Sequence, residues 1–320
     1  MKKILFLFTL ALVSCSNGVV IINESTFPDY CFRRFILSQW YGKDGKLTES
    51  EIKEITEIDV SNLNIENLNG IEYFTSLGTL RCERNNLTSI DLSKNTDLWQ
   101  LFCGENHIVS LDLTKNLELR TIMCDGNQLS ELNLANNSKT RDVFCDYNQL
   151  TTLDISNNPN LKFINCEHNK LTTLDVSKNK ELEELWCGNN YLTILDISKN
   201  TALKALYCSN NKISSLQISH NLLLETLHCD DNPIKAFDVS KNTYLKSLAC
   251  SNCQLNSINL SRNTSLTELW CYNNQLTELD LTQNTSLRIL WCYNNQLPEL
   301  DLSHIKGIKD LRLKDNQTKD

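Results

Sequence analysis

Residues 266–286 read LTELWCYNNQLTELDLTQNTS, and this stretch is one complete copy of a 21-residue repeat. The pattern, LxxLxCxxNxLxxLDLxxNxx, occurs eleven times from Leu77 to Gly307 without insertion or deletion. Its cysteine recurs at Cys82, Cys103, Cys124, Cys145, Cys166, Cys187, Cys208, Cys229, Cys250, Cys271 and Cys292. A fixed period of this length indicates one small structural unit that is stacked on copies of itself.

Each repeat consists of two similar halves, because the phrase LxxLxC is followed ten residues later by LxxLDL. Both phrases have the two-residue period of a strand, and no stretch shows the 3.6-residue period of a substantial helix. The asparagine after each phrase favours a turn, since its side chain can bond turn backbone groups and it tolerates left-handed geometry. We therefore expect both phrases to be strands, each pairing in parallel with its counterpart in the next copy.

Related sequence flanks the eleven copies. Residues 55–60 form a variant coil, and residues 308–316 form a partial twelfth copy in which Leu313 replaces the cysteine. A single coil cannot bury its own leucines, whereas stacked coils can. We therefore assign residues 55–316 to a solenoid with a core column of Leu, Ile and Cys, and residues 317–320 to a tail.

Two columns of asparagine accompany this core, one from Asn85 to Asn295 and the other from Asn95 to Asn284. Buried polar side chains are normally hydrogen-bonded. We interpret both columns as structural hydrogen-bonding ladders rather than as ligand-binding groups.

The eleven ladder cysteines are expected to be free, buried thiols, because each occupies an apolar position beside leucine. Neighbouring thiols should lie ~4.8 Å apart and point in parallel, whereas a disulfide requires Cβ atoms ~3.8 Å apart in a crossed geometry. Cys250 and Cys253 form a CxxC pair, a spacing that also occurs in zinc and redox sites. With no second such pair in the sequence, we interpret Cys253 as the replacement of a column asparagine.

The first residues have the pattern of a secretion signal. Lys2 and Lys3 precede an apolar run, residues 4–12, that is too short to span a membrane. The sequence LVSC ending at Cys15 resembles the bacterial lipobox, so we expect residues 1–14 to be a lipoprotein signal peptide and Cys15 to be acylated. An ordinary secretory signal is the alternative. Loss of the two lysines would change the formal charge from −8 to −10, and so acidic a chain is a poor nucleic-acid binder.

Between this leader and the solenoid, we assign residues 15–26 to an anchor and linker and residues 27–54 to a helical N-terminal cap. One face of a helix would be formed by Phe32, Phe35 and Ile36. Thr48 followed by Glu51 has the capping-box pattern of a second helix start. Repeat arrays need covered ends, so the cap is expected to cover the first coil.

The repeated LxxLxCxxNxLxxL motif resembles the leucine-rich repeat in a short bacterial form with a cysteine ladder, similar to the repeats of internalin-type surface adhesins. The resemblance covers about residues 55–316, and residues 27–74 also resemble the cap that precedes such repeats. It implies a leucine-rich repeat solenoid of stacked parallel β-strands and short turns, curved and right-handed, with a small helical cap. It also implies a protein that binds partners and does not catalyse a reaction.

The residues on either side of each ladder cysteine are expected to face solvent, because side chains alternate along a strand. The core positions scarcely vary, but these positions do, and many are aromatic. The candidate ligand-binding residues are Phe102, Phe144, Trp186, Tyr207, Trp270, Tyr272, Trp291 and Tyr293. Three acidic residues, Asp125, Asp146 and Glu167, are expected to line the same face.

Two roles remain open for these rings. Aromatic side chains can pair across neighbouring rungs and simply stabilise the sheet. Apolar stripes also mark contact sites, and Trp and Tyr often dominate interface energies. A protein ligand and a carbohydrate ligand are both compatible with such a stripe.

The sequence therefore predicts a non-enzymatic, adhesin-like binding module that is lipid-anchored in a bacterial cell envelope, surface-exposed or periplasm-facing. A structural or scaffolding lipoprotein without selective binding is the alternative. We assign no catalytic residue, metal site or cofactor, because the five histidines fall in different coils and a repeat rod lacks the enclosed pocket that catalysis favours. Contact with a membrane is expected only through the anchor, and no oligomeric state is assigned.

Overall fold

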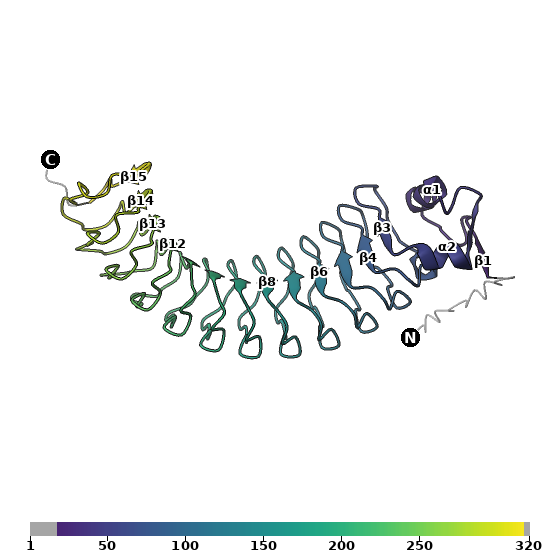
Figure 1. Cartoon of the computed structure of the whole chain (residues 1–320), viewed down its shortest axis with the longest axis horizontal. Coiled ribbons are helices and arrows are strands. Elements are labelled where there is room, and N and C mark those ends of the chain that lie inside the picture. The colour runs from purple at the N-terminus through teal and green to yellow at the C-terminus, as the bar shows by residue number, and fades with distance from the viewer. Residues whose placement is uncertain (1–17, 317–320) are drawn as a thin grey trace, which may run out of the picture.

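The computed structural model describes residues 18–316, most of which form a curved stack of coils, each one repeat long (Figure 1). In this part of the chain one parallel 13-stranded sheet contains the strands in chain order from β3 to β15. Its strands are β3 (Glu57–Asp59), β4 (Thr79–Arg81), β5 (Gln100–Phe102), β6 (Thr121–Met123), β7 (Asp142–Phe144), β8 (Phe163–Asn165), β9 (Glu184–Trp186), β10 (Ala205–Tyr207), β11 (Thr226–His228), β12 (Ser247–Ala249), β13 (Glu268–Trp270), β14 (Ile289–Trp291) and β15 (Asp310–Arg312). The parallel solenoid that the repeat predicts is thus confirmed.

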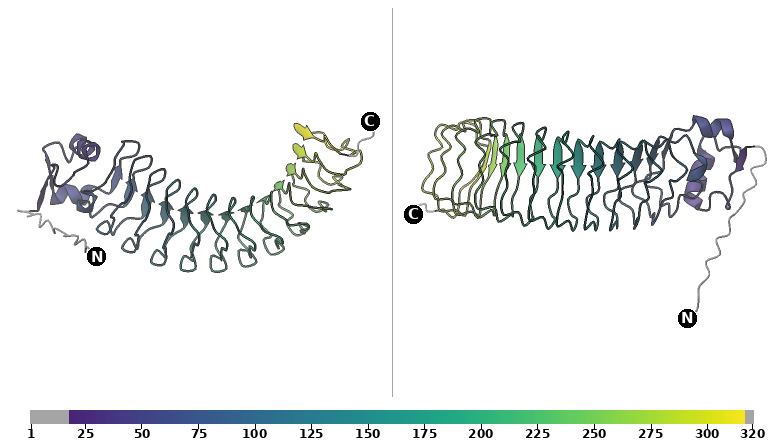
Figure 2. Two further views of the ribbon diagram at one scale, coloured as in Figure 1. Left: turned by 180° about the vertical axis from the view of Figure 1, so that it is seen from behind. Right: turned by 90° about the horizontal axis from the view of Figure 1, so that it is seen from below.

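The sheet lies along the inner side of the arc, with its strands side by side (Figures 1 and 2). Its register follows the repeat length: Ala205 of β10 pairs with Glu184 of β9 and with Thr226 of β11, each 21 residues away. Equivalent residues of successive repeats are therefore neighbours, and each repeat position forms a column along the sheet.

The second half of each repeat differs from the expectation that it is a strand. Throughout residues 18–316 the LxxLDL segments contain no strand; most of their residues have no regular secondary structure, and a turn follows each segment. The Asp175 carboxylate accepts a hydrogen bond from the backbone N–H of Ser177 at 2.8 Å, and such local bonds turn the backbone away from pairing with the next coil. Leu174 and Val176 are still buried in the core. An irregular extended segment therefore has the same alternation of apolar residues as a strand.

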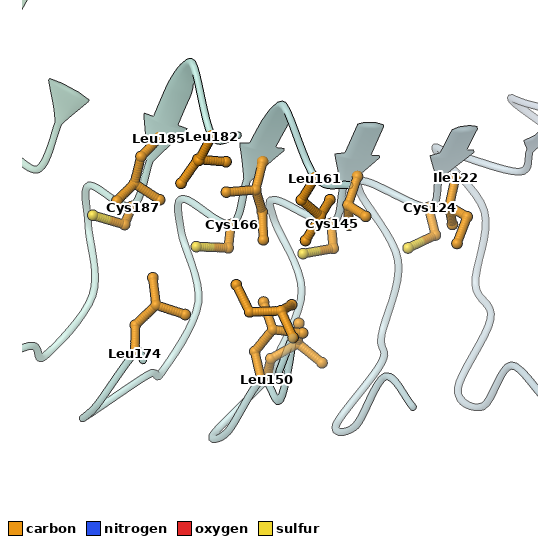
Figure 3. Packing of buried hydrophobic residues seen from close by; sticks show 14 of the residues in the cluster. Ile122, Cys124, Cys145, Leu150, Leu161, Cys166, Leu174, Leu182, Leu185 and Cys187 are labelled. Atoms are coloured by element: carbon orange, nitrogen blue, oxygen red, sulfur yellow. The ribbon is translucent and has the colours of Figure 1, made fainter. Parts of the chain in front are cut away.

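The core contains one cysteine from each repeat, and Figure 3 shows Cys124, Cys145, Cys166 and Cys187 in a line between leucines. All eleven ladder cysteines are buried free thiols, as the sequence predicts. Loss of contact with water disfavours the thiolate, and burial raises the pKa of the Cys166 thiol to about 12.

The first asparagine column bonds each coil to the coil before it. The Asn190 Nδ2 donates to the carbonyl oxygens of Cys166 and Cys187 at 2.9 and 3.2 Å, and its Oδ1 accepts from the Leu171 N–H at 2.9 Å. In the second column, the Asn179 amide donates to two carbonyls of the preceding coil. The interpretation of both columns as structural ladders is confirmed.

Cys253 takes the place of an asparagine in the first column. Its Sγ lies 3.2 Å from the carbonyl oxygen of Cys229, the acceptor that a ladder amide uses in other coils. A thiol has no counterpart of Oδ1, and the N–H of Ile234 bonds instead to the Asn232 carbonyl at 2.9 Å. Cys253 is therefore a replacement within the ladder, as its position in the repeat indicates.

The N-terminal end of the solenoid is covered by two short helices, α1 (Tyr30–Ser38) and α2 (Glu49–Glu54). Thr48 and Glu51 form the predicted capping box at the start of α2. The chain also forms a hairpin-like pair that the sequence did not predict, in which β1 (Val19–Ile21) runs antiparallel to β2 (Lys46–Thr48). A 3-10 turn, η1 (Ile71–Tyr73), follows the first coil.

Asp29 fastens the cap to the first coil. One carboxylate oxygen accepts from the Phe32 N–H at 2.8 Å and caps α1, and the other accepts from the Glu66 N–H at 2.8 Å. Phe27 is fully buried beside Gly70, where an added Cβ would collide with the Phe27 ring and where φ is 107°. Only glycine fits both the space and the backbone conformation at this position.

Replacing Cys187 with serine is expected to lower the free energy of unfolding by about 1–3 kcal/mol. The serine hydroxyl would lose its hydrogen bonds to water on folding and would gain no equivalent hydrogen bond in the apolar column. Cys187→Ala is the matched control, since it removes the sulfur without adding a polar atom. Urea denaturation followed by circular dichroism measures both variants. A serine variant at least as stable as the alanine variant would contradict an apolar surrounding for this column.

Candidate ligand-binding face

Three columns of side chains point away from the core on the inner side of the arc. In β9, Glu184 belongs to the first column and Trp186 to the second, while Leu185 between them is buried. The third column contains the residue after each ladder cysteine, such as Glu167 after Cys166. This face is the concave surface of the solenoid, and its composition changes from rung to rung while the core beneath it repeats.

Aromatic side chains form a continuous series of contacts along the concave surface, which we call the aromatic row. It consists of Phe144, Phe163, Trp186, Tyr207, His228, Trp270, Trp291, Tyr272 and Tyr293. Centroid separations run from 4.5 Å between Phe144 and Phe163 to 6.3 Å between Trp270 and Trp291. These separations lie in the range of favourable aromatic pairing.

Seven of the eight candidate rings lie in this row, each half-buried by its neighbours. Phe102 is the exception, because its side chain is only 6% exposed and the Arg81 guanidinium covers its ring at 4.0 Å from the centroid. The expectation that Phe102 faces solvent is therefore wrong. Alternation along a strand gives the direction of a side chain but does not say which neighbour covers it.

Phe163 belongs to the row but was not among the candidates. It lies in the first column and connects Phe144 to Trp186 beside Asn165, which interrupts the aromatic positions of the second column. The signal was present in the sequence, because Phe163 is two residues before Asn165 and so lies on the same strand face.

Beside the row, Asp125, Asp146 and Glu167 occupy three consecutive rungs of the third column, and we call them the acidic column. Burial, followed by the negative charge of Asp125, raises the pKa of Asp146 to about 6. Burial also raises the pKa of Asp125 and of Glu167. The face therefore holds like charges close together, as the sequence suggests for these residues.

Glycines on the neighbouring rungs provide the space into which the acidic column spreads. A Cβ at Gly104 would lie 2.6 Å from Oδ1 of Asp125, and a Cβ at Gly188 would lie 2.6 Å from Oε1 of Glu167. Asp125 thus leans towards the preceding rung and Glu167 towards the following one. This arrangement separates the two outer carboxylates from Asp146 and reduces their mutual repulsion.

One histidine lies among the aromatic rings. His228 lies within the aromatic row, where burial lowers its pKa, and its Nε2 is 3.0 Å from Oγ of Ser247.

Across residues 18–316, His, Cys, Asp and Glu side chains do not gather in any group of three or more that could hold a metal ion. The same part of the chain contains no helix with the length and apolar character needed to cross a membrane.

Comparison with known proteins gives consistent results. Residues 264–320 match the family described as Leucine Rich repeats (2 copies). Internalin J of Listeria monocytogenes serotype 4b (strain F2365) is 40% identical over 50 residues, which are 16% of this chain. That matched segment spans only 6% of the length of this relative.

Solved structures match over much more of the chain. One described as the functional domain of InlJ from Listeria monocytogenes, which includes a cysteine ladder, is 30% identical with a TM-score of 0.81, covering 94% of this chain and 72% of the other. An internalin, InlF, from Listeria monocytogenes str. 4b F2365 has a TM-score of 0.85 at 23% identity, covering 93% of this chain and 92% of the other. The second likeness shows a shared fold.

The acidic column is expected to make stability depend on pH. Because the folded pKa of Asp146 is about 6 and the ordinary value is 3.8, the unfolded chain releases this proton first as the pH rises, and stability is lost between about pH 4 and pH 6. Asp146→Asn should therefore be more stable than the native protein at about pH 7.5, with a smaller difference at about pH 4. Urea denaturation at the two pH values measures the effect.

Asp175→Asn is the control for this experiment, because hydrogen bonds from Ser177 lower the pKa of Asp175. This control is expected to show no gain in stability at the higher pH. An equal gain in stability for Asp146→Asn at both pH values would mean that the charge of the Asp146 carboxylate does not cause the gain.

Proposed function

Because the chain belongs to the leucine-rich repeat proteins, with the cysteine-ladder repeats of the internalin type, we propose that it is a non-enzymatic binding module that holds its ligand on the concave face. The aromatic row carries this proposal, since it extends from β7 to β14 along one surface. Half-buried Trp and Tyr side chains bind with little loss of conformational freedom and are frequent in the energetic centres of interfaces. A protein or a carbohydrate ligand, in an adhesin-like role, would be held there.

A structural or scaffolding role without selective binding is the second candidate, and the ring contacts also support it. Tyr272 and Tyr293 are almost parallel, with an interplanar angle of 4° and centroids 4.6 Å apart. Such cross-strand pairs contribute to the stability of a sheet. The two functions differ in what removal of the rings would change, namely binding in one case and thermal stability in the other.

We further propose that the protein is displayed on a bacterial cell envelope by acylation of Cys15. This residue lies outside the residues that the structure describes, so the proposal rests on the lipobox-like sequence LVSC that ends at this cysteine. The cap and β1 follow within a few residues. An anchor at this position would attach the capped end of the solenoid to the membrane and leave the concave face free.

Replacing Trp270 and Trp291 together with alanine is expected to weaken ligand binding by about tenfold or more, because two of the large rings of the row are removed. Binding of the native and variant proteins to a glycan array and to an array of cell-surface proteins measures this change. The matched control is Tyr191→Ala with Tyr244→Ala, which removes exposed rings outside the strands.

Thermal unfolding of the same proteins separates the two functions. A binding role predicts lost array signal with a small change in Tm, whereas a scaffolding role predicts a lower Tm and no selective array signal from either protein. Array binding that survives the tryptophan changes would contradict the assignment of the row as the binding site.

Replacing Cys15 with alanine is expected to abolish incorporation of an alkyne-labelled palmitate in a bacterial expression host, because the acyl acceptor is lost. The variant protein should leave the membrane fraction. Cys31→Ala is the matched control and should label like the native protein. Palmitate label retained on the Cys15 variant would refute the anchor.

A further inference from the structure

The chain's own arginines show how a cation sits on the concave face. The Arg81 guanidinium lies over the Phe102 ring at 4.0 Å, with Glu57 at 3.6 Å and Glu83 at 4.0 Å. Glu57 is in the first column and Glu83 is in the third, so this arginine occupies the space between two carboxylates and above a ring. At the other end of the concave face, Arg312 lies over Trp291 at 3.7 Å and is 3.5 Å from Asp310.

The middle of the concave face has the same ring and carboxylates but no such arginine. We call it the midsection: Phe144, Phe163 and Trp186 with the first-column residues Asp142 and Glu184 on one side and the acidic column on the other. Asp142 and Glu184 pair in register with Phe163 from the two neighbouring strands. None of the ion pairs found among residues 18–316 includes a carboxylate of the midsection.

The cationic side chains near these carboxylates do not form ion pairs with them. Arg84 lowers the pKa of Asp125 by less than burial raises it, and its own ion pair is with Glu105 at 3.0 Å. His168 likewise lowers the pKa of Asp146 by less than burial raises it.

Lys162 and Lys204 lie one position outside the first column, and both are paired with Glu183, at 3.1 and 2.6 Å. The midsection therefore keeps five carboxylates on two sides of a row of rings. Like charges held on neighbouring coils repel one another, and a cation from a partner relieves that repulsion.

The rings of the midsection favour a polypeptide over a sugar. Sugars stack on open aromatic faces, but the Phe144 and Phe163 rings cover one another, with centroids 4.5 Å apart and an interplanar angle of 26°. Trp186 packs against Phe163 on one side and Tyr207 on the other. A lysine or arginine side chain needs no open ring face, because its aliphatic stem can pack beside the rings while its charged head reaches a carboxylate.

We propose that the ligand of the concave face is a polypeptide segment that places basic side chains over the midsection, between the first-column carboxylates and the acidic column. This inference rests on the proposed function and names the class of ligand for the same surface. Arginine suits the site best, because its planar fork can reach carboxylates on both sides of the rings, as the Arg81 guanidinium does between Glu57 and Glu83 within the chain.

Selection of displayed random short peptides on the purified full-length protein tests the inference. Selected peptides are expected to be enriched in arginine and lysine, and a synthetic copy should bind the triple variant Asp125→Asn, Asp146→Asn, Glu167→Gln at least about tenfold more weakly than the native protein. The loss should shrink as salt is added, because screening weakens the charge pairs. Since the raised pKa values favour the uncharged forms, the variant is expected to fold, and its Tm verifies this.

The control is the triple variant Asp154→Asn, Asp175→Asn, Asp196→Asn, which removes the same number of charges from turns outside the strands. Asparagine suits this position, because Asn133 occupies it naturally and its Oδ1 accepts from the Ala135 N–H at 3.0 Å. Peptide binding by this variant should equal that of the native protein. Equal losses in the two variants, or selected peptides without basic residues, would overturn the inference.

Two further outcomes distinguish this inference from the proposed function. In the first, the glycan signal is lost in the Trp270 and Trp291 variant but kept in the acidic-column variant. This result would support the concave face as a binding site and overturn the inference that its ligand is a basic polypeptide. If neither peptides nor array ligands respond to changes in the rings or the carboxylates, both the proposed function and this inference fail.

Discussion

Each coil of this protein depends on backbone hydrogen bonds to the coils on its two sides. The Cys187 N–H, for example, donates to the Tyr207 carbonyl at 2.7 Å, and the Asn190 side chain bonds to four backbone groups within and before its own coil. No coil satisfies these groups alone, so the number of residues between successive strands must be constant. A shift of one residue would turn core leucines towards solvent, which explains why 21-residue spacing persists through eleven copies.

The same constraint creates the chemistry of the concave face. Because side chains 21 residues apart are neighbours, aromatic residues at one repeat position touch each other, and carboxylates at another crowd together. The contact between Trp186 and Tyr207 is a product of this alignment, and burial, followed by the charge of Asp125 one repeat away, raises the pKa of Asp146. A recognition surface can thus vary by changing single residues of a column while the core below stays the same.

The repeat pattern was sufficient to predict the parallel sheet, the buried cysteines and the asparagine ladders, because each depends only on the position of a residue within its own repeat. The capping box at Thr48 was also visible, since it involves residues close in sequence. The LxxLDL segments were mistaken for strands because an irregular segment that ends in a turn, such as the one that Asp175 stabilises at Ser177, has the apolar spacing of a strand. The burial of Phe102 was missed because it depends on Arg81, a residue of another coil that covers the ring.

The buried thiols also determine how this fold responds to its chemical surroundings. Thiol–disulfide exchange begins with a thiolate that can reach a partner, and each ladder cysteine is both enclosed and held in its protonated form. We therefore expect the solenoid to form without an oxidation step and to keep its structure in reducing and oxidising media alike. Most sulfur-rich extracellular domains depend on oxidation for their stability, whereas here the ladder sulfur atoms fill the core as reduced thiols.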